Sequence, residues 1–225
     1  MSPSVDVFWS FRSPYSYLAT PRLVRVAAEW TVDVRVRVVL PLAVRSPGFF
    51  ANVNPLWPAY LLRDTVRLAE HLGLPYAWPQ PDPVVQDYAT RAVAAEQPYI
   101  HRLTRLGVEA ERRGRGLALV DEVSRLIWGG GVRGWHEGEH LAAAAARAGL
   151  DLAAMEDAVA ENVAAYDAAI AANQQALEAA GHWGVPTMVV DGEPFFGQDR
   201  IDLLVWRMQQ RGLQRRAPTA TQRGR

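Results

Sequence analysis

The chain of 225 residues contains no cysteine and no lysine. Without a thiol of its own it cannot form a disulfide, bind a metal through thiolate or cycle between disulfide and dithiol. Without a lysine amine it cannot form a Schiff base. Its 24 basic residues are therefore all arginine, and 24 acidic residues balance them. Because the net charge is zero, no overall field attracts nucleic acid or a membrane, and we expect neither as a partner.

Long apolar runs are missing as well. Residues 1–6 have neither the basic nor the apolar region of a secretion signal. The longer apolar segments are all interrupted by Arg, Glu or Pro, so we expect no membrane span. These features predict a cytoplasmic protein, and the length fits one large domain or a domain with a big insertion.

The first 40 residues have the pattern of a β-α-β unit. Residues 5–9 form an apolar strand pattern, and residues 32–38 alternate valine with charge, as in a strand with one buried face. Between them, residues 14–30 have apolar side chains at helical spacing. This order favours a parallel strand pair joined by a right-handed crossover.

Residues 56–181 are predicted to be helical, because Ala, Leu, Arg and Glu dominate there and glycines divide the segment into separate helices. No fixed-period repeat is visible, so a helical solenoid is not expected. The predicted helices cover roughly residues 56–73, 84–113, 117–128, 138–148, 151–156 and 158–180.

Strand patterns return near the C-terminus. Residues 187–190 and 194–196 flank Asp191-Gly192, a strong signal for a hairpin turn. A last helix is expected over 199–210. These elements predict an α/β fold in which residues 1–55 and 182–212 form a discontinuous thioredoxin-like domain, residues 56–181 an all-helical insertion, and residues 213–225 a disordered tail.

Ser13 is the first candidate functional residue, because Ser13-Pro14-Tyr15-Ser16 stands at the start of the first helix, where a thioredoxin-like fold has its reactive pair. A serine there can simply cap the helix. It can also donate a hydrogen bond to a bound thiolate, which the helix dipole would stabilise. Geometry alone leaves both roles open. A hydrolase nucleophile at Ser13 or Ser16 is less favoured, since no G-x-S-x-G elbow is present.

Pro186 in Gly184-Val185-Pro186-Thr187 is the second marker. It is either an ordinary strand-start proline or the cis-proline that faces the helix start in a thioredoxin-like fold. In the second case, the Val185 backbone would offer its N–H and C=O to an extended peptide. Asp199 either caps the last helix or binds an ammonium group of a ligand.

Both ends of the chain resemble one family. The segment 11–19 is similar to the opening motif of 2-hydroxychromene-2-carboxylate isomerases and kappa-class glutathione transferases, and residues 183–204 resemble their C-terminal signature. Residues 60–64, 73–75 and 148–151 also resemble family segments. The likeness covers the chain to about Gln210.

The resemblance implies a DsbA-like fold with bound glutathione, or another low-molecular-weight thiol, and a homodimer. It places Ser13 against the sulfur and Val185 along the glutathione backbone. Gln198 and Asp199 would hold the γ-glutamyl end. An asparagine also contributes, for which Asn54 is the best match and Asn52 a rival.

The chain departs from the family pattern at three positions. Ser10 replaces a usual aspartate, Arg12 a frequent aliphatic residue, and Phe50 a frequent lysine. Arg12 or Arg45 is a candidate to replace the charge of that lysine. These changes bear on the substrate more than on the fold.

Histidines and aromatic residues leave further alternatives. His136-Glu137-Gly138-Glu139-His140 matches H-E-x-x-H, but the glycines predict a loop entering a helix, which disfavours zinc, and we expect no metal. His71, His101 and His182 are expected to be partly buried or surface residues and not catalytic ones. The aromatic residues of the helical part are expected mainly to pack. The alternative is that some line an apolar substrate pocket, with the candidates Trp57, Tyr60, Tyr88 and Trp183.

Three functions are compatible with these patterns. The first is a thiol-dependent isomerase of a conjugated double bond in an aromatic or polyene acid, with Ser13 as the catalytic residue. The second is a kappa-like glutathione transferase or peroxidase. The third is a catalytically inactive DsbA-like module that binds extended peptides through Val185.

Overall fold

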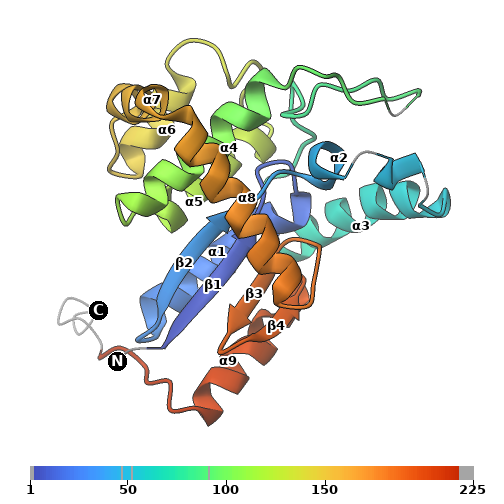
Figure 1. Ribbon diagram of the computed structural model, residues 1–225. Helices are drawn as coiled ribbons and strands as arrows, with labels where there is room; N and C mark the ends of the chain where they lie inside the picture. The colour runs from blue at the N-terminus through green and yellow to red at the C-terminus, as the bar shows by residue number, and fades with distance from the viewer. Residues whose placement is uncertain (1–2, 47, 52, 91, 218–225) are drawn as a thin grey trace.

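The computed structural model describes residues 3–217 except 47, 52 and 91. A four-stranded mixed sheet lies in one half of the molecule, with the strand order β2-β1-β3-β4 (Figure 1). The strands are β1 (Ser4–Trp9), β2 (Asp33–Val38), β3 (Thr187–Val190) and β4 (Glu193–Phe196). The sheet thus combines strands from both ends of the chain, as the α/β prediction requires.

The expected β-α-β unit is present. Helix α1 (Pro14–Glu29) connects β1 to β2, and the two strands pair in parallel with Val7 opposite Val36. On the other edge of β1, β3 runs antiparallel, with Val7 opposite Met188. Strand β1 therefore lies at the centre of the sheet, and its C-terminal end leads directly to the loop before α1.

The predicted hairpin between β3 and β4 is confirmed. The strands are antiparallel, with Val190 paired to Glu193. Asp191 and Gly192 have φ values of 49° and 78°. Two successive residues with positive φ are what a two-residue hairpin turn requires, and Asp-Gly suits that turn.

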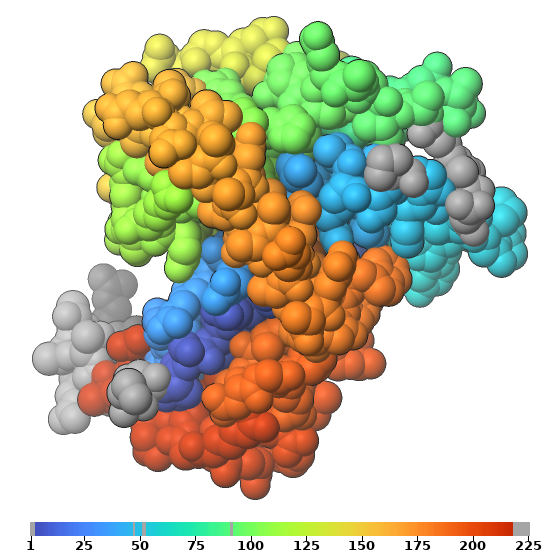
Figure 2. Space-filling model, in the orientation of Figure 1, coloured from blue at the N-terminus to red at the C-terminus, as the bar shows by residue number. Residues whose placement is uncertain are grey.

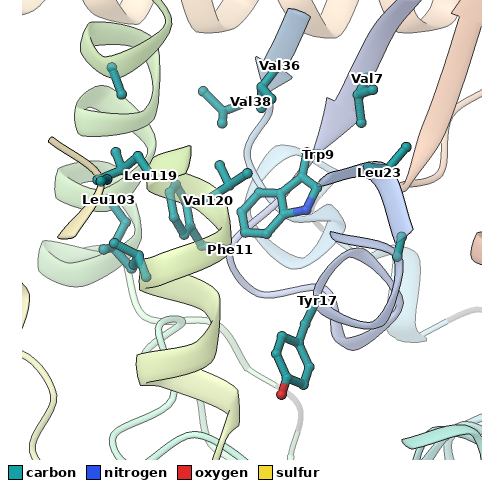
Figure 3. Close-up of a cluster of buried hydrophobic side chains, with 14 of the residues drawn as sticks. Val7, Trp9, Phe11, Tyr17, Leu23, Val36, Val38, Leu103, Leu119 and Val120 are labelled. Atoms are coloured by element: carbon teal, nitrogen blue, oxygen red, sulfur yellow. The ribbon is translucent and has the colours of Figure 1, made fainter. Parts of the chain in front are cut away.

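The side chains of β1 alternate between the two faces of the sheet. Val7 and Trp9 belong to the main core cluster, which α1, α4 (Pro98–Arg112) and α5 (Gly116–Trp128) share, whereas Phe8 packs with Leu177 on the other face. Figure 3 shows Trp9 and Phe11 among core side chains from both the sheet and the helices. The rings of Trp9 and Phe11 meet edge to face, with centroids 4.7 Å apart. One continuous core therefore supports the loop that carries the candidate site.

In Figure 1 most helices between β2 and β3 lie above the sheet or to its right, whereas α8 (Val163–Ala179) crosses in front of it. Figure 2 shows α8 running across both halves of the molecule. Two short elements, α2 (Leu42–Arg45) and η1 (Phe49–Ala51), precede them. The longer helices are α3 (Leu56–Leu72), α4 (Pro98–Arg112), α5 (Gly116–Trp128), α6 (His140–Arg147), α7 (Leu152–Glu161) and α8 (Val163–Ala179). The division into two domains stays a prediction.

Two helix boundaries were wrong. The break that the sequence predicts at residue 157 lies at Asn162, between α7 and α8. The sequence predicts a helix over 84–113, but α4 begins at Pro98. Instead, the Gln97 side-chain amide accepts from the Val85 N–H at 2.9 Å and donates to the Val85 carbonyl at 2.8 Å. Gln86 and Val93 form an isolated antiparallel β-bridge. Because proline disfavours a helical conformation of the residue before it, Pro98 can start α4 but separates it from the preceding segment.

The C-terminal helix α9 (Ile201–Gln210), which follows the 3-10 turn η2 (Gln198–Arg200), matches the prediction. The disordered tail does not, for the part that is described. Leu213 is buried, the Thr31 N–H donates to the Gln214 carbonyl at 2.9 Å, and the Arg216 N–H donates to the Glu29 carbonyl at 2.8 Å. Backbone pairing, which composition does not show, holds this segment. Residues 218–225 lie outside the described residues.

No helix among residues 3–217 (47, 52 and 91 aside) is long and apolar enough to cross a membrane.

Candidate functional site

The start of α1 has a backbone N–H group that no described residue uses. Ser13 caps the helix, with its Oγ accepting a hydrogen bond from the Ser16 N–H at 3.2 Å. Pro14 has no N–H, so the Tyr15 N–H is the group of the first turn that has no partner within the described part of the chain. An unpaired N–H at the positive end of a helix dipole favours a bound anion. The site therefore combines a hydroxyl with a free N–H.

The loop before β3 lies directly against this helix start. The Val185–Pro186 bond is cis, as the thioredoxin-like prediction requires. The Ser13 hydroxyl donates to the Val185 carbonyl at 3.3 Å, which joins segments 172 positions apart in the sequence. The Val185 N–H makes no hydrogen bond to any described residue. Val185 thus presents a free backbone donor beside Ser13.

Gln198 and Asp199 follow β4 in the turn η2. Arg22 of α1 donates to the Gln198 carbonyl at 2.7 Å and to its side-chain oxygen at 3.3 Å. Asp199 is more than half exposed and pairs with its neighbour Arg200 at 2.8 Å. Gln198 is therefore anchored to α1, whereas the Asp199 carboxylate remains accessible to a cationic group.

Asn54 has a local structural role. Its side-chain oxygen accepts from the Leu56 N–H at 3.0 Å at the start of α3. No hydrogen bond in the described part of the chain connects Asn54 with Ser13 or Val185, so its proposed ligand contact stays a prediction. The rival Asn52 lies outside the described residues.

The two arginines proposed to replace a family lysine are both engaged. Arg45 donates to the Leu40 carbonyl at 3.0 Å and to the Trp183 carbonyl, and burial lowers its pKa. Arg12 forms an ion pair with Asp82. Arg45 forms no ion pair within the described residues, and the Glu178 carboxylate offsets part of the positive charge that it brings to the loop that carries Val185.

A cavity of about 930 Å³ adjoins Arg12. Its wall is mostly apolar and aromatic and combines residues of the Phe50 turn, of α3 and of the loop 78–88. A volume of this order suits a small organic ligand, and a few placed polar groups in such a wall fix its orientation. Arg12, which directly precedes Ser13 in the chain, lines this cavity, whereas Ser13, Tyr15 and Val185 do not.

The polar part of the cavity wall is an ordered network around Asp82. Through Nε and Nη2, Arg12 donates hydrogen bonds to the two carboxylate oxygens of Asp82 at 3.1 and 2.8 Å. The Asp82 carboxylate also accepts a hydrogen bond from the Tyr88 hydroxyl at 2.6 Å and one from the Val84 N–H at 2.8 Å. The Arg12 guanidinium also lies over the Trp78 ring, 4.6 Å from its centroid. Such bidentate and stacked contacts hold the arginine in one orientation.

The aromatic candidates separate into two groups. Trp57 and Tyr88 line the cavity, but Tyr60 and Trp183 do not. The Tyr60 hydroxyl donates to Asp64 at 3.2 Å, and Trp183 packs on Phe49 with ring centroids 5.3 Å apart. Both therefore have structural contacts outside the cavity.

Sequence reasoning missed part of this wall. It weighed Arg12 only as a substitute for a family lysine, and it gave Asp82 no role. Asp82 stands in Pro81-Asp82-Pro83, where periodicity carries no information, and its partner Arg12 is 70 positions away. An acidic residue fixed between two prolines was the one available signal.

The histidine motif lies outside this region. His140 begins α6, so most of the motif precedes the helix, as the glycines indicate. No group of three or more His, Asp or Glu side chains that could hold a metal occurs within the described ranges. His182 accepts from the Gly184 N–H at 2.9 Å and stacks on Phe196. His182 is partly buried, as expected.

Two serine hydroxyls of the site region are enclosed. Ser10 and Ser16 have buried Oγ atoms without a hydrogen-bond partner among the described residues. Neither they nor Ser13 contact a histidine in this part of the chain. The arrangement lacks the base that a hydrolase nucleophile needs, which disfavours that alternative.

The sheet order, the cis-proline and the helix start together define a thioredoxin-like protein. The chain belongs to the family of DSBA-like thioredoxin domains, which it matches over residues 4–209. It is similar to a 2-hydroxychromene-2-carboxylate isomerase of Pseudomonas putida, with 28% identity over 89% of this chain and 91% of the relative. The resemblance predicted to these isomerases is confirmed, and that to kappa-class transferases stays a prediction.

Solved structures agree with this assignment. A 2-hydroxychromene-2-carboxylate isomerase superposes with a TM-score of 0.68 and 25% identity, covering 92% of this chain and 95% of that one. The cytosolic disulfide reductase DsbM of Pseudomonas aeruginosa with GSH has a TM-score of 0.57 and 17% identity, covering 92% and 99%. The second likeness shows the fold alone.

Proposed function

We propose that the protein is a thiol-dependent isomerase that acts on a conjugated double bond of an aromatic or polyene acid, similar to 2-hydroxychromene-2-carboxylate. The observation that carries the proposal is the pairing of Ser13 with Val185 beside an apolar cavity, in a chain that has no cysteine. Structures with this fold include a disulfide reductase, whereas this chain combines the helix start and the cis-proline without a cysteine. The names of its relatives support the reaction class.

The residues present fit a bound glutathione. The Ser13 hydroxyl and the Tyr15 N–H would stabilise its sulfur as thiolate, and the free Val185 N–H would bind its backbone. The exposed carboxylate of Asp199 suits its ammonium group. When bound, glutathione supplies a nucleophile that adds reversibly to an electron-poor alkene and so permits rotation about that bond.

Ser13 has a defined task in this scheme. Its hydroxyl has one proton, which now points to the Val185 carbonyl. Rotation of that O–H would direct the proton to a neighbouring sulfur. Donors already in position stabilise charge without reorganisation of the site.

The proposal also implies a location and an assembly. Reduced thiols are kept available in the cytoplasm, so we propose that the protein works there. The homodimer implied by the family resemblance is proposed as well, and analytical ultracentrifugation tests it.

A test of the function is Ser13→Ala. With glutathione present, we expect turnover of a cis conjugated acid, followed by its absorbance, to fall about 100-fold or more, since loss of one such donor costs about that in kcat. The alanine also loses the helix cap, which costs about 1 kcal/mol of the free energy of unfolding. The glutathione is expected to be recovered unchanged, whereas a transferase would consume it.

Asp151→Ala is the matched control, because Asp151 caps α7 through the Ala154 N–H at 3.2 Å. It should lose a similar amount of stability and keep full activity. Full activity of Ser13→Ala would contradict the assigned role. If wild-type protein neither binds glutathione in calorimetry nor accelerates isomerisation, the inactive peptide-binding module becomes the better hypothesis.

A further inference from the structure

Arg12 has a hydrogen-bond donor that no described residue uses. A role of this donor in catalysis rests on the proposed function, whereas its role in ligand binding does not. Two of the three guanidinium nitrogens, Nε and Nη2, are bonded to Asp82. Nη1 has no hydrogen-bond partner among the described residues, and it is not one of their fully enclosed unpartnered atoms. Since Arg12 lines the cavity, the two N–H groups of Nη1 are available to a molecule inside it.

The charge of the wall decides what kind of group these N–H groups can bind. The charged residues among those that line the cavity are Arg12, Asp82 and Asp87. Asp87 accepts from the Ala89 and Thr90 N–H groups at 2.7 and 2.9 Å, which lowers the pKa of its carboxyl. One cation and two carboxylates in the wall disfavour a further anion in a mostly apolar space.

A ligand group here must accept hydrogen bonds from Nη1 and should bring no further charge into the cavity. A neutral carbonyl oxygen does both. In a conjugated ketone or aldehyde this oxygen is also the atom on which negative charge develops when a nucleophile adds to the alkene. Ser13, where that nucleophile is expected, is the next residue in the chain.

We propose that Arg12 is a specificity-determining residue that binds, through Nη1, the carbonyl oxygen of an uncharged conjugated ketone or aldehyde group in this cavity. Asp82, Tyr88 and Trp78 act as positioning residues for the guanidinium. An acid group, where the substrate has one, lies outside the cavity. The aromatic wall binds the flat conjugated system.

The experiment measures binding without any thiol. The probes are trans-4-phenylbut-3-en-2-one, a neutral ketone, and trans-cinnamate, a carboxylate of similar shape. Calorimetry gives both dissociation constants, and infrared difference spectra report the carbonyl stretch of the bound ketone. For wild-type protein we expect the ketone to bind at least tenfold more tightly than cinnamate, with its carbonyl stretch lowered by the hydrogen bonds.

Arg12→Lys keeps a cation beside Asp82 but removes the Nη1 arm. It should weaken ketone binding about tenfold and return the carbonyl stretch toward its value in an apolar solvent. The double variant Arg12→Met/Asp82→Asn removes the buried charge pair together, which avoids an unpaired carboxylate if the single change does not fold. Arg105→Met is the matched control, because Arg105 forms the same bidentate contact with Asp167, away from the cavity lining.

The outcomes separate the two proposals. Tighter binding of cinnamate that is lost in Arg12→Lys would overturn the neutral-carbonyl assignment and make Arg12 a carboxylate anchor. Equal binding of the ketone by wild type and Arg12→Lys would overturn any ligand role of Arg12. A wild-type protein that shows the expected ketone binding but no thiol-dependent isomerisation would refute the proposed function alone.

Discussion

At the scale of single residues, the absence of cysteine and the identity of residue 13 carry the functional argument. Ser13 occupies a helix start whose free N–H and dipole favour a thiolate, but a serine hydroxyl does not ionise in the accessible pH range. The site can therefore stabilise a thiolate that comes from outside and cannot supply one. Placing a thiol at this position tests the electrostatics directly.

The variant Ser13→Cys would contain the only cysteine of the chain. We expect its thiol to have a lower pKa than an exposed cysteine, because the Tyr15 N–H and the positive end of α1 stabilise the thiolate. Alkylation by iodoacetamide at a series of pH values measures this pKa. The reactive fraction should already be large at a pH where an ordinary thiol is still protonated.

A suitable control is Gln209→Cys, an exposed position at the opposite, C-terminal end of a helix, α9. The negative end of the dipole there should leave the thiol pKa unchanged or raised. If both cysteines titrate together, the helix start exerts no useful field, and the thiolate argument for Ser13 loses its physical basis.

Site residues were predictable from sequence where a local pattern marks them. Ser13 stands at a recognisable helix start, and Val185 precedes a proline that marks a strand start, so both could be placed before the structure. Arg12 and Asp82 could not be paired, since their contact spans 70 positions. The free Nη1 depends on a rotamer, which no sequence pattern reports.

At the scale of elements, the close approach of α4 to β2 explains a glycine within a helix. Gly107 lies in α4, and a Cβ placed there would come within 2.8 Å of a Val38 methyl and 3.2 Å of the Phe11 ring. The helix thus touches the sheet at a point where no side chain fits. This contact also fixes Phe11, which lies two residues before Ser13.

Gly107→Ala separates packing from helix propensity. Alanine favours an isolated helix by about 1 kcal/mol over glycine, so propensity alone predicts stabilisation. We expect the opposite, a loss of about 1–3 kcal/mol in urea unfolding, because the added methyl overpacks a tight contact. Gly131→Ala, which meets nothing within 4 Å, is the control and should be near neutral. A more stable Gly107→Ala variant would show that α4 can move away from β2.

The elements differed in how well the sequence predicted them. The strand alternation in 33–38, the Asp191-Gly192 turn and the helices 116–128 and 140–147 were predictable, because short-range periodicity and turn chemistry determine them. The segment 84–97 has helical composition but is held by the Gln97 side chain and the Gln86–Val93 bridge. Such contacts override propensity and leave no periodic signal.

At the scale of the whole molecule, residues 213–216 pack against the chain just after α1. The Gln214 carbonyl accepts from both the N–H and the hydroxyl of Thr31 at 2.9 Å, and Arg215 lies over the Trp30 ring at 5.0 Å. Trp30 and Leu213 are both buried. Residues 213–216 therefore close the core at the end of α1, although their composition suggested disorder.

Truncation measures what this closure contributes. A chain that ends at Gly212 loses Leu213 from the core and both Thr31 hydrogen bonds, whereas a chain that ends at Ala217 keeps them. We expect the shorter chain to be less stable by about 2–4 kcal/mol in urea unfolding, the usual cost of removing a buried leucine. Its Trp30 should become more accessible to acrylamide, since the covering residues are gone. Equal stability and equal quenching of the two chains would contradict the closure, and residues 213–216 would then contribute nothing to the fold.

Because α1 carries Ser13 at its other end, the same pair of chains also shows whether the site depends on this closure. An intact helix start should bind glutathione equally in both, so a loss of binding in the shorter chain would mean that α1 is held as a unit from Trp30 to Ser13.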